Sequence, residues 1–194
     1  MALNNRVNIS IVIIGSYQCG KTSIVQRWVR PSVRPFVDET LAIEVLSNSI
    51  RLNDNIYLVR LWDTSGRVMY EPLLSKYIYN ADCVVLVYDV TDKDSWLKMQ
   101  QWMETIKKDH NKNIPICIIG NKIDKESIRR IHKQDVHTYV RNCGMGNIIH
   151  GECSAYTGEN CFSLYQMVIH YSKKPSKETW TSISEKKESN CLIV

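Results

Sequence analysis

The chain has 194 residues, of which 44% are hydrophobic and 23% charged, and its formal net charge is +5 at pH 7. This length suits one domain with a sizeable core and a short tail, and the composition is ordinary for a soluble globular protein. The seven cysteines have no paired spacing and form no CxxC motif, which argues against a disulfide framework and for reduced thiols in the cytosol. No signal peptide is recognisable, and no apolar run reaches the roughly 18 residues of a membrane-spanning helix, so we expect a soluble protein unless lipid is attached.

Short apolar runs alternate along the chain with segments of helical periodicity. The runs are rich in Val and Ile, which is typical of strands buried on both faces of a parallel sheet. They predict strands at residues 7–14, 56–62, 83–88, 114–119 and 148–153, and a more polar, alternating edge strand at 41–50. Helices are predicted at residues 21–29, 93–108, 133–142 and 159–171. In the second helix an apolar stripe at helical spacing indicates core packing: Trp96, Met99, Trp102, Met103 and Ile106.

This alternation predicts an α/β fold in which crossover connections build a mostly parallel sheet with helices on both faces. In such sheets the ligand lies beyond the carboxyl ends of the strands. Each polar motif described below follows one of the predicted strands. From about residue 173 the composition turns to Lys, Ser, Glu and Thr. We therefore expect a domain at residues 1–172 and a flexible tail at 173–194.

The first polar motif is Gly-Ser-Tyr-Gln-Cys-Gly-Lys-Thr at residues 15–22, which fits GxxxxGK[ST] between a predicted strand and a helix. The glycines allow backbone N–H groups and the helix N-terminus to surround phosphate oxygens. We expect Lys21 to reach the β- and γ-phosphates and the Thr22 hydroxyl to bind Mg²⁺. The candidate phosphate-binding set is Gly15, Ser16, Tyr17, Gln18, Cys19, Gly20, Lys21, Thr22 and Ser23.

The second motif, Trp-Asp-Thr-Ser-Gly at residues 62–66, follows the third strand. The Asp63 carboxylate is a candidate for the Mg²⁺ shell, and Gly66 can offer its N–H to a γ-phosphate. Thr40 lies in a loop and is a candidate second hydroxyl ligand that becomes ordered when the γ-phosphate is present. An Asp-Gly turn and a loop threonine are common features by themselves. Their position behind a phosphate loop favours the metal site Thr22, Thr40 and Asp63.

The third motif, Asn-Lys-Ile-Asp at residues 121–124, suits recognition of a guanine base. One carboxylate, that of Asp124, can accept from both N1–H and the exocyclic amine of guanine, a donor pair that adenine lacks. We expect the Lys122 stem to lie along the base and Asn121 to connect loops. After the last strand comes Cys-Ser-Ala at residues 153–155. There the Ala155 N–H is a candidate partner of the guanine carbonyl oxygen, with Ser154 beside it.

With these motifs in order, the sequence resembles the small GTPases of the Ras superfamily over about residues 6–172. Within the superfamily it is similar to the Rab group in Leu-Trp-Asp at 61–63, Tyr-Ile-Tyr-Asn-Ala at 77–81 and Val-Tyr-Asp-Val-Thr-Asp at 87–92, and loosely in Thr-Leu-Ala-Ile-Glu at 40–44. The resemblance implies a P-loop NTPase fold with a six-stranded, mostly parallel sheet and five helices. It also implies GTP, GDP and Mg²⁺ as ligands, and trafficking effectors, exchange factors and GTPase-activating proteins as partners.

Several positions depart from the family pattern. Arg67 stands where the family has the glutamine that orients the attacking water, and Ser65 stands where alanine is usual. Arginine has no acceptor, so it cannot take a hydrogen bond from that water. Tyr17 brings bulk to a position of small residues beside the catalytic groups Lys21 and Gly66. Val33 replaces an aromatic residue that packs on guanine, and Tyr156 replaces a lysine.

These departures predict that the chain binds nucleotide but hydrolyses GTP slowly. Three alternatives remain. Arg67 is a solvated loop residue and a partner protein supplies the missing group; or the chain is a GTP-bound scaffold with negligible turnover; or it is a P-loop nucleoside or ATP-dependent kinase, which the Asn-Lys-Ile-Asp motif disfavours. Comparing single-turnover hydrolysis with Arg67→Gln addresses the scaffold alternative, and competition between GTP and ATP addresses the kinase.

The last four residues, Cys-Leu-Ile-Val at 191–194, fit a CaaX prenylation box with Cys191 as the lipid acceptor. A single prenyl chain beside a weakly basic stretch would attach the protein reversibly to the cytosolic face of endomembranes or the plasma membrane. We expect a monomer. We also expect no binding to nucleic acid, because basic and aromatic residues do not interleave. His132 and His137 lack the spacing and partners of a zinc site.

Overall fold

The computed structural model describes residues 6–32, 34–35, 39–52, 55–109 and 114–172. Its strands are β1 (Arg6–Gly15), β2 (Ile43–Leu52), β3 (Asn55–Thr64), β4 (Cys83–Asp89), β5 (Ile116–Asn121) and β6 (Ile148–Glu152). Its α-helices are α1 (Lys21–Val29), α2 (Glu71–Tyr79), α3 (Lys93–Asp109), α4 (Lys133–Asn142) and α5 (Cys161–Ser172). Two short 3₁₀ helices, η1 (Val68–Tyr70) and η2 (Ile123–Ile128), lie in the connections.

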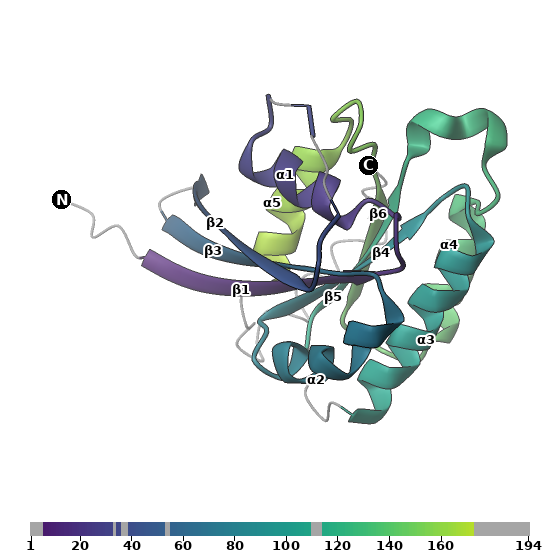
Figure 1. The fold of residues 1–194 in the computed structure, drawn as a ribbon, viewed down its shortest axis with the longest axis horizontal. Helices are drawn as coiled ribbons and strands as arrows, with labels where there is room; N and C mark the ends of the chain where they lie inside the picture. The colour runs from purple at the N-terminus through teal and green to yellow at the C-terminus, as the bar shows by residue number, and fades with distance from the viewer. Residues whose placement is uncertain (1–5, 33, 36–38, 53–54, 110–113, 173–194) are drawn as a thin grey trace, which may run out of the picture.

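The six strands form one sheet in the order β2-β3-β1-β4-β5-β6, as Figure 1 shows. Only β2 is antiparallel to its neighbour, and the other pairs are parallel. The predicted fold class, with six mostly parallel strands flanked by helices, is therefore confirmed. The predicted edge strand also lies at an edge, although it spans Ile43–Leu52, two residues later than expected.

Helices cover both faces of the sheet, with α1 and α5 on one face and α2, α3 and α4 on the other (Figure 1). Alternation along β1 sends Ile11 and Ile13 to the core beneath α1 and α5, and Val12 and Ile14 to the opposite core. Because both faces of this central strand are buried in its second half, residues 11–14 form a continuous apolar run.

Helix α2 was not predicted from the residues, although the family resemblance implied a fifth helix. It has nine residues, carries a proline in its first turn and buries only Leu74 and Ile78. Two buried positions in so short a segment give a weak helical period, so packing against the sheet decides its structure. Within the described part of the chain, no helix combines the length and the apolar character needed to cross a bilayer.

Candidate functional site

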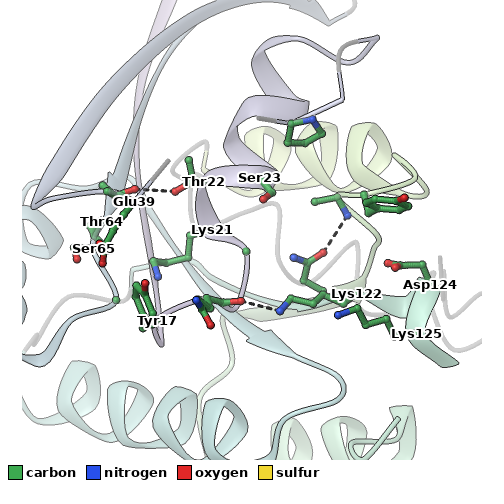
Figure 2. Close-up of a pocket in the computed structure, with 18 residues that line it drawn as sticks. Tyr17, Lys21, Thr22, Ser23, Glu39, Thr64, Ser65, Lys122, Asp124 and Lys125 are labelled. Carbon is green, nitrogen blue, oxygen red and sulfur yellow. Dashed lines mark hydrogen bonds between the residues drawn. The ribbon is translucent and has the colours of Figure 1, made fainter. Parts of the chain in front are cut away.

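A cleft of about 730 Å³ opens where the parallel strands end. It is lined by Tyr17, Gln18, Gly20, Lys21, Thr22, Ser23, Pro35, Glu39, Thr40, Thr64, Ser65, Gly66, Asn121, Lys122, Asp124, Lys125, Ala155 and Tyr156. Figure 2 shows Lys122, Asp124 and Lys125 grouped at one end and Tyr17, Glu39, Thr64 and Ser65 at the other, with Lys21 between them. All three sequence motifs therefore meet in one cleft.

The loop between β1 and α1 encloses the Lys21 side chain. Lys21 is only 5% exposed, and its Nζ donates to the Ser16 carbonyl oxygen at 2.8 Å, which directs the ammonium group into the loop. Gly20 has φ of 96°, and a Cβ there would come within 2.1 Å of Asn121 Nδ2. A side chain at position 20 is thus excluded both by backbone conformation and by space. The loop can wrap closely around an anion at the N-terminus of α1.

Gly66 brings the loop after β3 against this phosphate loop. A Cβ on Gly66 would lie 2.3 Å from the Tyr17 backbone nitrogen, so only glycine allows this approach. Backbone contact of this kind places the Gly66 N–H at the same end of the cleft as Tyr17 and Glu39. An N–H there is suited to a terminal phosphate oxygen.

Three oxygen-bearing side chains from different segments converge beside Lys21. The Thr22 hydroxyl donates to Asp63 Oδ2 at 2.6 Å, and the Thr22 and Thr40 hydroxyl oxygens lie 2.9 Å apart. Asp63 is fully buried, and its Oδ1 has no hydrogen-bond partner among the described residues. Burial raises the pKa of this carboxyl. A buried carboxylate oxygen without a donor, next to two hydroxyls, fits the hard oxygen ligand set of Mg²⁺.

At the other end of the cleft, Asn121 connects two loops. Its Nδ2 donates to the Cys19 carbonyl oxygen at 3.0 Å, and its Oδ1 accepts from the Ala155 N–H at 3.0 Å. Lys122 extends from the same strand end, and its Nζ donates to the Gln18 carbonyl oxygen at 2.8 Å (Figure 2) and pairs with Asp89 at 2.6 Å. The Asn-Lys-Ile-Asp motif at residues 121–124 is therefore hydrogen-bonded to the phosphate loop.

Asp124 faces the cleft while one of its oxygens is held from behind. The Ser154 hydroxyl donates to Asp124 Oδ1 at 2.5 Å. Ser154 is fully buried, so this bond fixes the orientation of the carboxylate. A fixed carboxylate acceptor is suited to a pair of N–H donors on one edge of a base.

Arg27 of α1, which the sequence analysis did not single out, supports the loop after β6. It is 8% exposed and donates to the carbonyl oxygens of Ala155 at 2.8 Å, Pro31 at 3.0 Å and Tyr156 at 2.7 Å. The Arg34 guanidinium lies 4.0 Å from the centroid of the Tyr156 ring. No local motif marks Arg27 because its partners are more than a hundred positions away in sequence, Pro31 excepted.

Arg67 does not line the cleft. Its Nε donates to Glu39 Oε1 at 2.7 Å, its second guanidinium nitrogen also pairs with that carboxylate, and it lies 5.9 Å from the centroid of the Tyr17 ring. The hydrogen bond to Glu39 raises the pKa of Arg67. The guanidinium is thus engaged by a protein carboxylate.

The other predicted residues lie around the cleft or outside the described chain. Gly15, Ser16, Cys19, Asp63 and Ser154 are buried or packed behind its lining. Val33 and Cys191 lie outside the described residues. Five lining positions had no predicted site role: Thr64 and Ser65, which belong to the second motif, and Pro35, Glu39 and Lys125, which belong to none.

The sequence model of the Ras family matches residues 10–174 of this chain. This chain belongs to the Ras family. It is 30% identical to the GTP-binding protein YPT53 of Saccharomyces cerevisiae over 179 residues, which cover 89% of this chain and 80% of the yeast protein. It is 28% identical to the Ras-related protein Rab-5A of Dictyostelium discoideum over 179 residues, 92% of this chain and 86% of that protein.

A third relative is longer. The chain is 29% identical to the human EF-hand calcium-binding domain-containing protein 4B over 157 residues, 77% of this chain, and spans only a fifth (20%) of that protein. Membership of the Ras family makes this chain a small GTPase of a family that binds GTP and GDP, and its similarity to Rab-5A makes it Rab-like. It also argues against the nucleoside-kinase alternative.

Proposed function

We propose that this GTPase is a Rab-type switch of vesicle trafficking that binds GTP or GDP with Mg²⁺ and hydrolyses GTP slowly. The observation that carries the proposal is the single cleft that joins Lys21, the Thr22–Asp63 pair and Asp124. One end of the cleft is suited to polyphosphate and the other to a guanine edge. Effectors would recognise the loops around Thr40 and Gly66 when a γ-phosphate orders them.

Within this proposal, Lys21 and the backbone of residues 15–22 hold the phosphates. Thr22, Thr40 and Asp63 hold Mg²⁺, which neutralises phosphate charge. Asp124 accepts from guanine. The Ala155 N–H, which donates to Asn121 Oδ1 in the protein alone, would turn to the guanine carbonyl oxygen when the base binds. The oxygen of Asp63 that lacks a protein donor supports the metal assignment.

Two side chains support slow hydrolysis. A guanidinium can donate but cannot accept, so Arg67 cannot orient a water molecule as a glutamine does. Its pairing with Glu39 also directs the guanidinium toward another loop. Tyr17 places an aromatic ring, 48% exposed, at the mouth of the phosphate loop.

The rate of phosphate release in a single turnover tests this. We expect the Arg67→Gln variant, loaded with GTP, to hydrolyse it at least about tenfold faster than the wild type, because a positioned acceptor is restored. Arg60→Gln is the matched control, since Arg60 is an exposed arginine on β3 outside the cleft. Equal rates for the wild type and Arg67→Gln would contradict the proposal that Arg67 is the cause of slow hydrolysis.

A second candidate function is a GTP-bound scaffold with negligible turnover, which the same Arg67 and Tyr17 favour. The nucleotide that copurifies with the protein separates the two. GDP indicates a cycling switch, and GTP indicates a scaffold. Competition between GTP and ATP for the purified protein additionally tests the choice of base by Asp124.

We further propose residues 1–172 as the GTPase domain and residues 173–194 as a tail that is prenylated at Cys191. A thioether-linked prenyl group would hold the protein reversibly on the cytosolic face of endomembranes or the plasma membrane. Exchange factors and GTPase-activating proteins would act on it there. Mass spectrometry of the peptide containing Cys191, from protein made in eukaryotic cells, tests the modification. An unmodified thiol in membrane-bound protein would contradict it.

A further inference from the structure

An exposed ion pair joins the two loops that border the γ-phosphate end of the cleft. Glu39 immediately precedes Thr40, and Arg67 immediately follows Gly66. Arg67 Nε donates to Glu39 Oε1 at 2.7 Å, and a second guanidinium nitrogen pairs with the same oxygen. The contact links two side chains that lie 28 positions apart in the sequence.

Neighbouring contacts hold the Arg67 side chain toward Glu39. The Arg67 N–H lies 3.4 Å from the Ser65 hydroxyl oxygen, which accepts from it. The guanidinium also lies near the face of the Tyr17 ring, 5.9 Å from its centroid, at the outer limit of a cation–π contact. Glu39 supplies the negative charge at this position, so it decides where the guanidinium rests.

The same two segments are joined by one backbone hydrogen bond. The Ser65 N–H donates to the Ala42 carbonyl oxygen at 2.7 Å. The Thr40 hydroxyl also lies 3.4 Å from Oδ2 of Asp63, two residues before Ser65. The bond continues the β2–β3 ladder one residue beyond the Ile43–Thr64 pair, so exchange at the Ser65 amide reports whether the two segments stay paired where the loops begin.

We propose that Glu39 is the positioning residue of Arg67 and that the pair is a latch, which favours closure of the Thr40 and Gly66 loops whether GDP or GTP is bound. The proposal rests on the proposed function and adds a regulatory feature to it. In a switch without such a pair, the γ-phosphate must supply the closing contacts. Here the residue at the glutamine position supplies part of that closure.

The latch shifts the loop equilibrium by a modest factor. Both side chains are partly exposed, 48% for Arg67 and 37% for Glu39. Exposed ion pairs change an equilibrium by about two- to fivefold. The latch therefore biases the loops without fixing them. Because GTP binds best to closed loops, a larger closed population strengthens GTP binding relative to GDP.

Amide hydrogen exchange in GDP-loaded protein tests the latch. We expect Glu39→Gln, which removes the charge and keeps the shape, to speed exchange at the Ser65 amide about two- to fivefold. The single reversals Glu39→Arg and Arg67→Glu should do the same, and the double reversal should restore the wild-type rate. Glu104→Gln is the matched control, because Glu104 forms a similar exposed pair with Lys107 at 2.6 Å on α3.

A second measurement uses the ratio of affinities for a non-hydrolysable GTP analogue and for GDP. We expect this ratio to fall about two- to fivefold in Glu39→Gln and to recover in the double reversal. Unchanged Ser65 exchange in Glu39→Gln, or a double reversal no slower than the single ones, would overturn the latch. Protein that binds no GDP would instead overturn the proposed function, and the latch with it.

Discussion

The two ends of the cleft are built in different ways. At the base end, Asn121 and Ser154 are almost completely buried, and their hydrogen bonds join the loops after β1, β5 and β6. At the γ-phosphate end, Tyr17 and the Arg67 side chain are each 48% exposed. A buried polar network is costly to break because each unpaired group remains desolvated. Exposed contacts can change at little cost to the fold.

This contrast indicates a division of tasks. The base end fixes which nucleotide is bound and requires an intact interior. The γ-phosphate end sets the rate of hydrolysis and the balance of loop positions through side chains that the core does not need. The departures Tyr17 and Arg67 from the family pattern lie at this exposed end. Ser65 also departs there but is buried, and Val33 and Tyr156 depart as well.

The largest effect is expected at Asp124. Asp124→Asn removes the charged acceptor while Ser154 keeps its place, so GDP affinity should fall about 100-fold or more. Isothermal titration calorimetry with Mg²⁺-GDP measures the loss. The control is Glu126→Gln, an exposed neighbour outside the cleft lining. A loss below about fivefold would show that the base end does not select guanine through this carboxylate.

Arg27 tests whether the base end depends on the interior. Arg27→Leu removes three hydrogen bonds to loop carbonyl groups, and we expect the free energy of unfolding to fall by about 2 kcal/mol. Nucleotide dissociation should quicken as well, since the Ala155 carbonyl loses its donor. Urea denaturation and release of a fluorescent GDP report the two effects. If Arg27→Leu were as stable as the wild type, the base end would not depend on these buried hydrogen bonds.

The contact of Arg34 with Tyr156 lies at the base end but is exposed. Like the exposed contacts at the γ-phosphate end, it should be removable at little cost to the fold. Arg34→Ala should speed GDP dissociation about two- to fivefold, because an exposed cation–π contact is weak. Tyr156→Ala should match it, and Tyr156→Phe should not, since it keeps the ring. If Tyr156→Phe released GDP as fast as Tyr156→Ala, the ring contact would not be the cause.

The smallest effect is expected away from both ends, where His150 of β6 packs against His137 of α4 with ring centroids 4.5 Å apart. Burial, and then the charge of His137, lower the pKa of His150. Below about pH 6.5 the unfolded chain therefore binds a proton that the folded one resists. Stability should decrease as pH falls through this range, and His150→Gln should flatten the decrease measured by thermal unfolding. An equally steep decrease in His150→Gln would contradict this origin.

Local sequence predicted most of the strands and the cleft residues of the three motifs, because a strand followed by its loop is a contiguous segment. It placed β2 two residues early and missed α2, whose short apolar pattern carries little information. It also missed Glu39 and Lys125 in the cleft lining and Arg27 behind it. Nothing in the neighbouring residues marks these side chains, and the roles of Glu39 and Arg27 come from partners that are remote along the chain.

The sequence by itself determined the α/β order of elements, the phosphate loop around Lys21 and the candidate base acceptor Asp124, since each depends on residues a few positions apart. Only the tertiary structure decided which partner Arg67 takes, because a guanidinium pairs with whichever carboxylate the fold brings within reach. The packing of the Thr40 loop against the Gly66 loop brings Glu39 there.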